Sequence, residues 1–172
     1  MTAKPCLLAA ASLLIGTAAT AAGGPTDPQI AHIAYTAGNI DIDAARLALK
    51  KSKTPAVREF ASEMVRDHEA VNQKALALVN KLQVTPEQNA TSEGLTKHAA
   101  ESRTKLEKLH GKAFDKAYAA NEVAYHKTVN GALKTTLIPS ADNGELKSLL
   151  ETGLTLFSEH QKHAEHLSAS LK

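Results

Sequence analysis

Residues 27–82 read DPQIAHIAYTAGNIDIDAARLALKKSKTPAVREFASEMVRDHEAVNQKALALVNKL and contain two helix starts. Asp27-Pro28 and Thr54-Pro55 each place a good capping residue directly before a proline that fits the first turn of a helix. The apolar residues after each start recur at the i, i+3, i+4, i+7 spacing of a helix that faces a core. Because almost nothing separates the two predicted helices, they must fold back antiparallel as a helical hairpin.

The rest of the chain repeats this arrangement after a polar connection, VTPEQNATS at 84–92. A shorter helical stretch follows and stops at Gly111, and a longer one ends at the break PSADNG, 139–144. Asp142 and Glu145 resemble a capping box at the start of the last helix. The expected helices span about 27–52, 54–82, 95–109, 115–137 and 142–171. The sequence thus predicts an all-α bundle of four long helices, with two hairpins joined by a crossover helix.

The composition supports one such domain and excludes one class of partner. The chain has 172 residues, of which 43% are hydrophobic and 22% charged, enough to bury a core. Lys and Arg number 20 against 18 Asp and Glu, and basic residues with interleaved aromatics do not cluster. We therefore expect no nucleic-acid partner.

Residues 1–22 have the layout of a secretory signal peptide. Lys4 precedes an apolar run at 6–16, and a stretch of small residues follows at 17–22. The apolar run is too short for a stable membrane span, and an uncleaved anchor is the alternative. Cleavage after Ala21 or Ala22 would leave a helical domain at 23–172, with no stable membrane span and without Cys6, the single cysteine. This predicts a periplasmic protein that has neither disulfides nor thiolate metal sites.

Five polar residues fall on the apolar stripes of the long helices. They are Asp41, His68, Glu122, His126 and His160. A buried carboxylate or imidazole must be paired, hydrogen-bonded or bound to a metal, because leaving it alone costs several kcal/mol. Two interpretations stay open: core histidines bonded to a neighbouring carboxylate or carbonyl, and ligands of a transition metal such as Fe, Cu or Zn.

Counting residues from the turns gives an expected level for each group. Asp41 and His68 lie equally far, ~20 Å along a helix axis, from the Thr54 turn, so we expect them side by side. The same count from the break at 139–143 places His160 nearer to Glu122 than to His126. The inward groups should therefore not all lie at one level.

The last helix carries a second candidate metal site at its end. Its members are Glu159, His160, His163, Glu165 and His166. Neighbours three and four residues apart share a helix face, so the imidazoles could chelate a metal weakly, and a solvated polar end is the alternative. The level count also places Asp115 near His163 and His166, although Asp115 is equally suited to cap a helix after Gly111.

Motifs of several enzyme classes are missing from the sequence. It has no Gly-rich phosphate loop, no Gly-x-Ser-x-Gly elbow and no Cys–His pair. The one Glu-x-x-His, Glu107 to His110, lies on the crossover helix, whereas a di-iron carboxylate bundle needs this motif on two long helices. No catalytic residues are predicted, and whether the protein is an enzyme stays open.

Four stretches resemble a known family: Asn39–Asp43, Val57–His68, Gly111–Tyr118 and Glu159-His160. The most specific are Met-Val-Arg-Asp-His at 64–68 and Phe-Asp-Lys-Ala-Tyr at 114–118. They are similar to exported bacterial proteins, described as periplasmic or outer-membrane proteins, that carry only a domain-of-unknown-function label. The resemblance covers Pro28 to Leu171. It implies a ferritin-like four-helix bundle and a place in the cell envelope, outer-membrane association included, without an established reaction.

The chain departs from this family at three positions. It has Asp41 and Asp43 where relatives commonly have Glu, and Tyr125 where an acid is frequent. Two functions remain in competition. The first is a structural, stress-related or interaction role in the envelope, with inward polar groups that fix helix register, and with an envelope protein or a second copy as partner. The second is periplasmic metal binding or metal-dependent chemistry.

Overall fold

The computed structural model describes residues 23–171, so the predicted signal peptide lies outside the described residues. Within these residues all regular structure is helical, which confirms the all-α prediction. Five main helices form the bundle, and two short elements, η1 and α5, continue the fourth. The elements are α1 (Asp27–Lys51), α2 (Pro55–Leu82), α3 (Ala90–Glu107), α4 (Gly111–Ala132), the π-helix η1 (Leu133–Leu137), α5 (Ile138–Ser140) and α6 (Gly144–Ser170).

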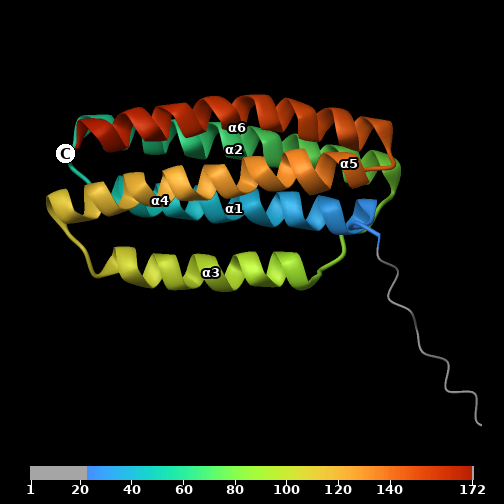
Figure 1. The fold of residues 1–172 in the computed structure, drawn as a ribbon, viewed down its shortest axis with the longest axis horizontal. Coiled ribbons are helices and arrows are strands. Elements are labelled where there is room, and N and C mark those ends of the chain that lie inside the picture. Colours follow the sequence, from blue (N-terminus) through green and yellow to red (C-terminus); the bar gives the residue numbers. More distant parts are fainter. Residues whose placement is uncertain (1–22, 172) are drawn as a thin grey trace, which may run out of the picture.

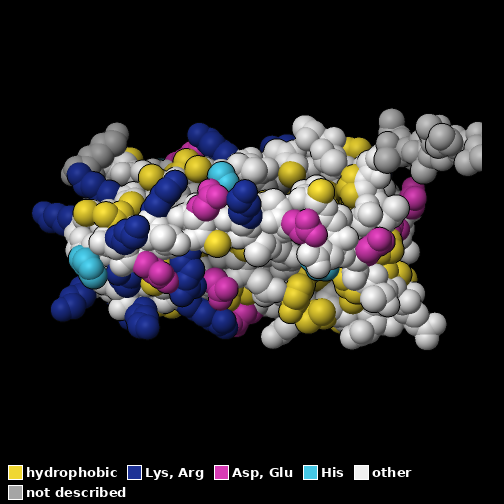
Figure 2. Space-filling view, turned by 90° about the horizontal axis from the view of Figure 1, so that it is seen from below, with side chains coloured by type: hydrophobic (Ala, Val, Ile, Leu, Met, Phe, Trp, Pro, Cys, Tyr) yellow, Lys and Arg dark blue, Asp and Glu magenta, His cyan; other side chains and the backbone are white. Residues whose placement is uncertain are grey.

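The long helices α1, α2, α4 and α6 run side by side, and α3 lies outside them along α1 and α4 (Figure 1). This confirms two hairpins connected by a crossover helix. Lys and Arg side chains gather over one half of the face in Figure 2, toward the end that holds the α3–α4 connection and the C-terminus. Within residues 23–171, no helix is both long and apolar enough to span a membrane.

The first hairpin forms as the sequence predicts. Thr26 and Gln29 cap the start of α1 reciprocally, and Pro55 occupies the first turn of α2. In the turn, Ser52 Oγ accepts a hydrogen bond from the backbone N–H of Thr54 at 3.2 Å. The turn is too short for any arrangement except antiparallel packing.

The second hairpin begins and turns at other residues than expected. α4 starts at Gly111, with His110 as its N-cap, so Asp115 is not a cap but lies buried one turn inside the helix. The cap of α6 is Asn143 and not Asp142, because Asn143 Oδ1 accepts from the N–H groups of Glu145 and Leu146 at 2.9 and 3.0 Å. Several neighbouring residues could cap these helices, and packing selects among them.

The helix also continues past Leu137, where the sequence predicted its end. Pro139 has no N–H to donate to a carbonyl one turn earlier, and its ring crowds that turn. The chain adapts through the π-helix, in which the N–H of Ile138 bonds to Leu133 O, five residues back. Helical geometry then extends to Ser140. The turn before α6 is therefore shorter than expected, and its midpoint lies closer to the start of α6.

The apolar core is divided into two clusters. One surrounds Phe60, Met64 and Phe114 near the α1–α2 turn, and the other surrounds Ile30, Leu137 and Leu150 at the opposite end. Between them lie buried polar side chains, which we call the polar band: Asp41, His68, Glu122, His126 and His160. Each member is at most 3% exposed. The five residues that the sequence placed on the apolar stripes are thus all inside the bundle.

Candidate metal centre

Three histidines from three helices meet in the polar band. His68 lies on α2, His126 on α4 and His160 on α6. Their ring centroids are 5.8 Å apart for His68 and His126, 5.3 Å for His68 and His160, and 5.6 Å for His126 and His160. One ring nitrogen from each lies within 4.8 Å of the others. We call these three side chains the imidazole trio.

Asp41 brings a carboxylate from α1 to the trio. Its Oδ2 lies 2.9 Å from His68 Nε2 and 3.3 Å from His126 Nε2. The predicted juxtaposition of Asp41 and His68 is therefore confirmed, and it follows from their equal distance to the α1–α2 turn. With Asp41 from α1, all four long helices contribute a side chain to the cluster.

His126 is held by a bond on its outer nitrogen. Nδ1 lies 3.0 Å from the backbone carbonyl of Glu122, so Nδ1 is assigned the proton and donates it. Nε2 then presents a lone pair toward Asp41 Oδ2. Two electron-rich atoms 3.3 Å apart repel one another unless a cation lies between or beside them.

His160 is held in the same way from the other side. Its Nε2 donates to Asp67 Oδ2 at 3.1 Å, and Arg66 in turn binds both oxygens of Asp67. This leaves His160 Nδ1 facing inward. Histidines that bind metals in proteins characteristically donate the opposite N–H to a carboxylate or carbonyl, as His126 and His160 do here.

Several buried atoms of the cluster make no hydrogen bond within the described part of the chain. Among them are both Asp41 oxygens, both His68 nitrogens, His126 Nε2 and His160 Nδ1. Asp41 Oδ2 and His68 Nε2 are close enough for a hydrogen bond, but their angles do not meet the geometry of one. Both atoms therefore count as unbonded despite the short distance between them. Since buried polar atoms are nearly always satisfied, the donor set fits a bound cation that would engage these atoms together.

The pKa values of the two buried carboxyl groups are shifted in opposite directions. Burial, the largest influence, works to raise the pKa of Asp41, but the opposing attraction of His68 and His126 brings it to about 2. Burial and the nearby charge of Asp41 raise the pKa of Glu122 well above its ordinary value. Asp41 is therefore an anion at neutral pH, whereas the same surroundings favour the protonated form of Glu122.

The surroundings of two of the histidines favour the neutral form. Burial lowers the pKa of His126, and burial followed by the charge of His68 lowers that of His160 to about 4. Neutral imidazole is the form that binds metals. A cation held between these imidazoles would also interact favourably with the buried, negatively charged carboxylate of Asp41.

The prediction that His160 lies away from His126 is wrong. Because the helix continues to Ser140, the midpoint of the turn lies further along the chain than the count assumed. In an antiparallel pair, the residue on α4 that lies opposite His160 then moves toward His126 by about twice that number of residues. Helical side chains also point toward the N-terminus of their own helix, so imidazoles from the antiparallel helices α4 and α6 reach toward a common level. The count compared Cα positions and omitted both effects.

The C-terminal histidines are not brought together. His160 points into the polar band, His163 Nδ1 lies 2.7 Å from Glu63 Oε2, and His166 is exposed. Among the described residues, no candidate metal group contains His163 or His166. Residues three apart drift around the helix, so the first and last of this series face different ways.

Asp115 contacts neither of these histidines. Its Oδ2 accepts a hydrogen bond from Thr54 Oγ1 at 2.6 Å, which ties α4 to the α1–α2 turn. Sequence reasoning also missed two acids on α2, Glu63 and Asp67, which form a candidate group with His160 at the edge of the cluster. Both are only partly buried and so lay off the apolar stripes that guided the prediction.

Solved structures with the same arrangement of helices include two proteins. CopM in its Cu(II)-bound form shares 14% identity at a TM-score of 0.66, covering 87% of this chain and 99% of CopM. A DUF305 protein from Streptomyces coelicolor, provisionally described as secreted, shares 11% identity at a TM-score of 0.71 and covers 83% and 91% of the two chains. At these identities the likeness establishes a shared fold alone.

No curated protein matches the sequence. Residues 13–167 match the profile of a family described as a domain of unknown function, DUF4142. This agrees with the resemblance to an uncharacterised family that the motifs at 64–68 and 114–118 indicated. Because the match spans most of its length, the chain belongs to the DUF4142 family.

Proposed function

We propose that the protein is an exported metal-binding helical bundle in which His68, His126 and His160 hold one transition-metal ion and Asp41 supplies a carboxylate. The observation that carries this proposal is the convergence of three buried imidazoles whose inward nitrogens have no hydrogen-bond partner among the described residues. Glu122 would act through His126, whose Nδ1 donates to the Glu122 carbonyl. The proposal concerns binding and assigns no reaction.

The donor set favours copper or zinc over a di-iron pair. Imidazole nitrogen suits Cu, Zn, Fe and Ni, and at one site Cu²⁺ binds most tightly of the divalent first-row ions. A di-iron carboxylate centre needs several glutamates, whereas the carboxyl groups of the band are those of Asp41 and Glu122. The Cu(II)-bound state of CopM, which shares this fold, supports copper as the first ion to test. We further propose that the bundle has a ferritin-like topology but does not carry out the iron chemistry of ferritins.

A path for the ion runs along the partly buried side of α2 and α6. Glu63 and Asp67 lie within reach of a ring nitrogen of His160, and Glu63 also contacts His163. Acidic oxygens at the edge of the cluster would attract a divalent cation and pass it to His160. Here His163 takes a role in entry, while His166 stays in solvent.

A structural role is the second candidate. His126 and His160 each make one good hydrogen bond without a metal, to Glu122 O and Asp67 Oδ2. These bonds could fix the register of the helices, as buried polar groups do in some bundles. A purely structural band would leave metal content near zero, which separates the two candidates, and an envelope partner or a second copy would then carry the function.

Elemental analysis of protein purified without an affinity tag tests the proposal. We expect about one equivalent of Cu or Zn per chain after dialysis against the metal. His160→Ala should lose most of it, whereas a His163→Ala, His166→Ala double variant should retain it. Equal metal content in wild type and His160→Ala would contradict the proposal, as would a loss confined to the double variant.

Export is the other part of the proposal. The layout of residues 1–22 supports removal of a signal peptide and release into the periplasm, where the outer membrane is one surface that the protein could meet. N-terminal sequencing of the exported protein should begin at Ala22 or Gly23. A mature chain that still begins at Met1 would indicate an uncleaved anchor instead.

A further inference from the structure

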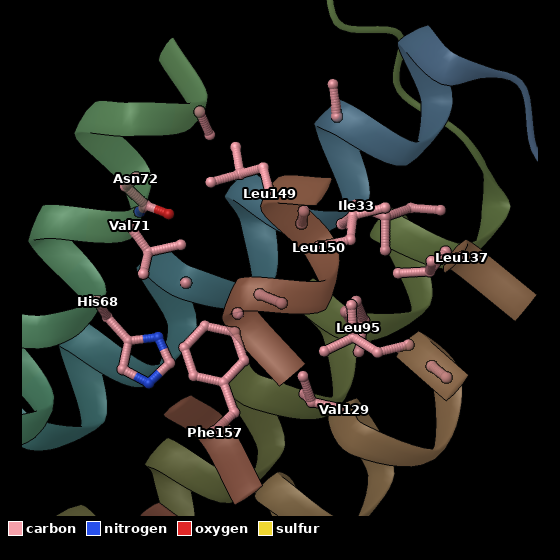
Figure 3. Close-up of a pocket in the computed structure, with 18 of the residues that line it drawn as sticks. Ile33, His68, Val71, Asn72, Leu95, Val129, Leu137, Leu149, Leu150 and Phe157 are labelled. Carbon is pink, nitrogen blue, oxygen red and sulfur yellow. The ribbon is translucent and has the colours of Figure 1, made fainter. Parts of the chain in front are cut away.

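A cavity of about 320 Å³ lies beside the imidazole trio, toward the end of the bundle where α1 begins. In Figure 3 the rings of His68 and Phe157 lie next to each other at one end of it, and aliphatic side chains such as Leu150 surround the remainder. The two rings are stacked, with centroids 4.6 Å apart and planes 6° apart. This volume is roughly twice that of an engineered cavity that holds benzene.

Small residues keep the cavity open. The small residues that line it include Ala34 and Ala37 on α1, Ala75 on α2, Ala132 on α4 and Gly153 on α6, so every long helix contributes an alanine or a glycine. The rest of the wall is mostly Ile, Leu, Val and Phe. Polar side chains such as His68, Asn72 and Tyr125 are a minority of the lining, and the aliphatic part offers ordered waters none of the polar partners that they need. An apolar occupant suits this cavity.

The lining of the cavity follows two of the long helices. On α2 its lining extends from His68 to Val79, and on α6 from Leu146 to Phe157. Each of these stretches rises ~16 Å along its helix. An alkyl chain of medium length that lies parallel to these two helices would contact the lining along both of them.

One end of the cavity is polar and the wall between α3 and α4 reaches solvent. His68 is 3% exposed, and neither of its ring nitrogens makes a hydrogen bond within the described residues. The lining residues Thr91 on α3, Thr128 on α4 and Thr136 in η1 are exposed, which places the opening beside the π-helix. π-helical turns occur often at functional sites, where they displace side chains from regular helical positions.

We propose that this cavity binds one alkyl chain of medium length that carries an uncharged, hydrogen-bonding head group, with the head at His68 and the chain along α2 and α6. An anionic head would lie close to the carboxylate of Asp41, whose Oδ2 is 2.9 Å from His68 Nε2, so a hydroxyl is favoured over a carboxylate. This inference goes beyond metal binding, because the chain contacts aliphatic residues that are not metal ligands, and the head group needs only the His68 ring nitrogen that a metal leaves free.

A displacement assay tests this site. A neutral fluorescent naphthylamine dye is bound first and then displaced with decanol, and decanoate serves as the charged comparison. Decanol should bind at least about tenfold more tightly than decanoate. Ala75→Leu, which fills the cavity, should weaken dye and decanol binding by about tenfold or more. Ala77→Leu is the matched control, since Ala77 is exposed on the same helix and does not line the cavity.

Ala34→Leu fills the same cavity from α1 and guards against misfolding of the first variant. Each filled variant should melt at or above the wild-type temperature, which shows that lost binding does not come from lost structure. Binding that is unchanged in both folded variants would overturn the proposal, and so would the absence of decanol binding to wild type. Decanoate bound as tightly as decanol would overturn the uncharged head group. Metal content should remain at the wild-type level in both variants, so this test and that of the metal centre fail separately.

Discussion

His160 and His166 lie on the same helix, yet one is 1% exposed and the other faces solvent. His160 fills space between α2, α4 and α6 and donates to Asp67. We expect His160→Ala to lower the free energy of unfolding of the metal-free protein by roughly 1–3 kcal/mol, the usual cost of an orphaned buried partner. His166→Ala should change it by less than about 0.5 kcal/mol. Urea unfolding in EDTA measures both, and equal values would place His160 outside the core.

The lowered pKa of His160 predicts a pH dependence. Burial and the charge of His68 lower it from 6.5 to about 4 in the folded protein. The unfolded chain therefore takes up this proton first as the pH falls, and stability at this site, complete above 6.5, is lost progressively toward 4. Glu122 acts in the opposite direction because burial raises its pKa. The pH dependence of wild-type stability would therefore combine the contributions of His160 and Glu122.

Comparison of wild type with His160→Gln isolates the contribution of His160. We expect the stability difference between them to shift against wild type by on the order of 3 kcal/mol as the pH falls across this window. Urea titrations of the metal-free proteins at several pH values measure it. A difference that does not change with pH would mean that His160 titrates alike in the folded and unfolded chains.

At the residue scale, sequence reasoning located pairs within a hairpin better than pairs between hairpins. Asp41 and His68 flank one short turn, so counting residues fixed their relation, and they lie 2.9 Å apart. Asp67 and His160 are 93 residues apart in the chain and meet only because α2 packs on α6. Periodicity indicates which face of a helix is buried, but it carries no information about which helix covers that face.

At the element scale, Asp27 connects the beginning of α1 to the turn before α6. Its Oδ1 and Oδ2 accept from the backbone N–H groups of Asp142 and Asn143 at 3.0 and 2.9 Å. We expect Asp27→Ala to lower the free energy of unfolding by about 2 kcal/mol, because both bonds go to a charged acceptor. Asp43→Ala, an exposed position on the same helix, is the control. Thermal unfolding followed by circular dichroism compares them, and equal melting temperatures would contradict this role.

Helix existence was predictable, while some helix ends were not. The Asp-Pro and Thr-Pro starts of α1 and α2 were found because cap and proline coincide with the onset of the apolar stripe. Gly111 was interpreted as the end of one helix, and it begins the next with a φ of 55°. Pro139 was interpreted as a break, and the π-helix absorbs it. Local signals at these two positions fit either outcome, so tertiary packing decides.

At the scale of the whole molecule, the core contains a polar band and an apolar cavity, both of which cost stability in the absence of ligands. Apolar side chains that line an unfilled cavity lose packing contacts that a ligand would restore. Filling either site should therefore raise stability. We expect Cu²⁺ at about 100 times its dissociation constant to add about 2.7 kcal/mol to the free energy of unfolding. Unfolding with and without the metal measures this, and the gain should be absent in His160→Ala.

The architecture of the bundle and the members of the polar band were within reach of the sequence, but the cavity was not. Inward polar residues interrupt apolar stripes and so stand out in a single chain. A cavity arises where short side chains from several helices face one another, and alanines such as Ala75 and Ala132 are indistinguishable by pattern from those that pack tightly. Only the assembled helices bring them together.

The central claim is that the imidazole trio binds a metal ion. X-ray diffraction from crystals of the copper-loaded protein, recorded at the copper absorption edge, tests it most directly. Our account predicts one anomalous peak per chain, within about 2.0–2.2 Å of a nitrogen from each of His68, His126 and His160. No peak inside the bundle, or a peak only beside His163 or His166, would contradict it.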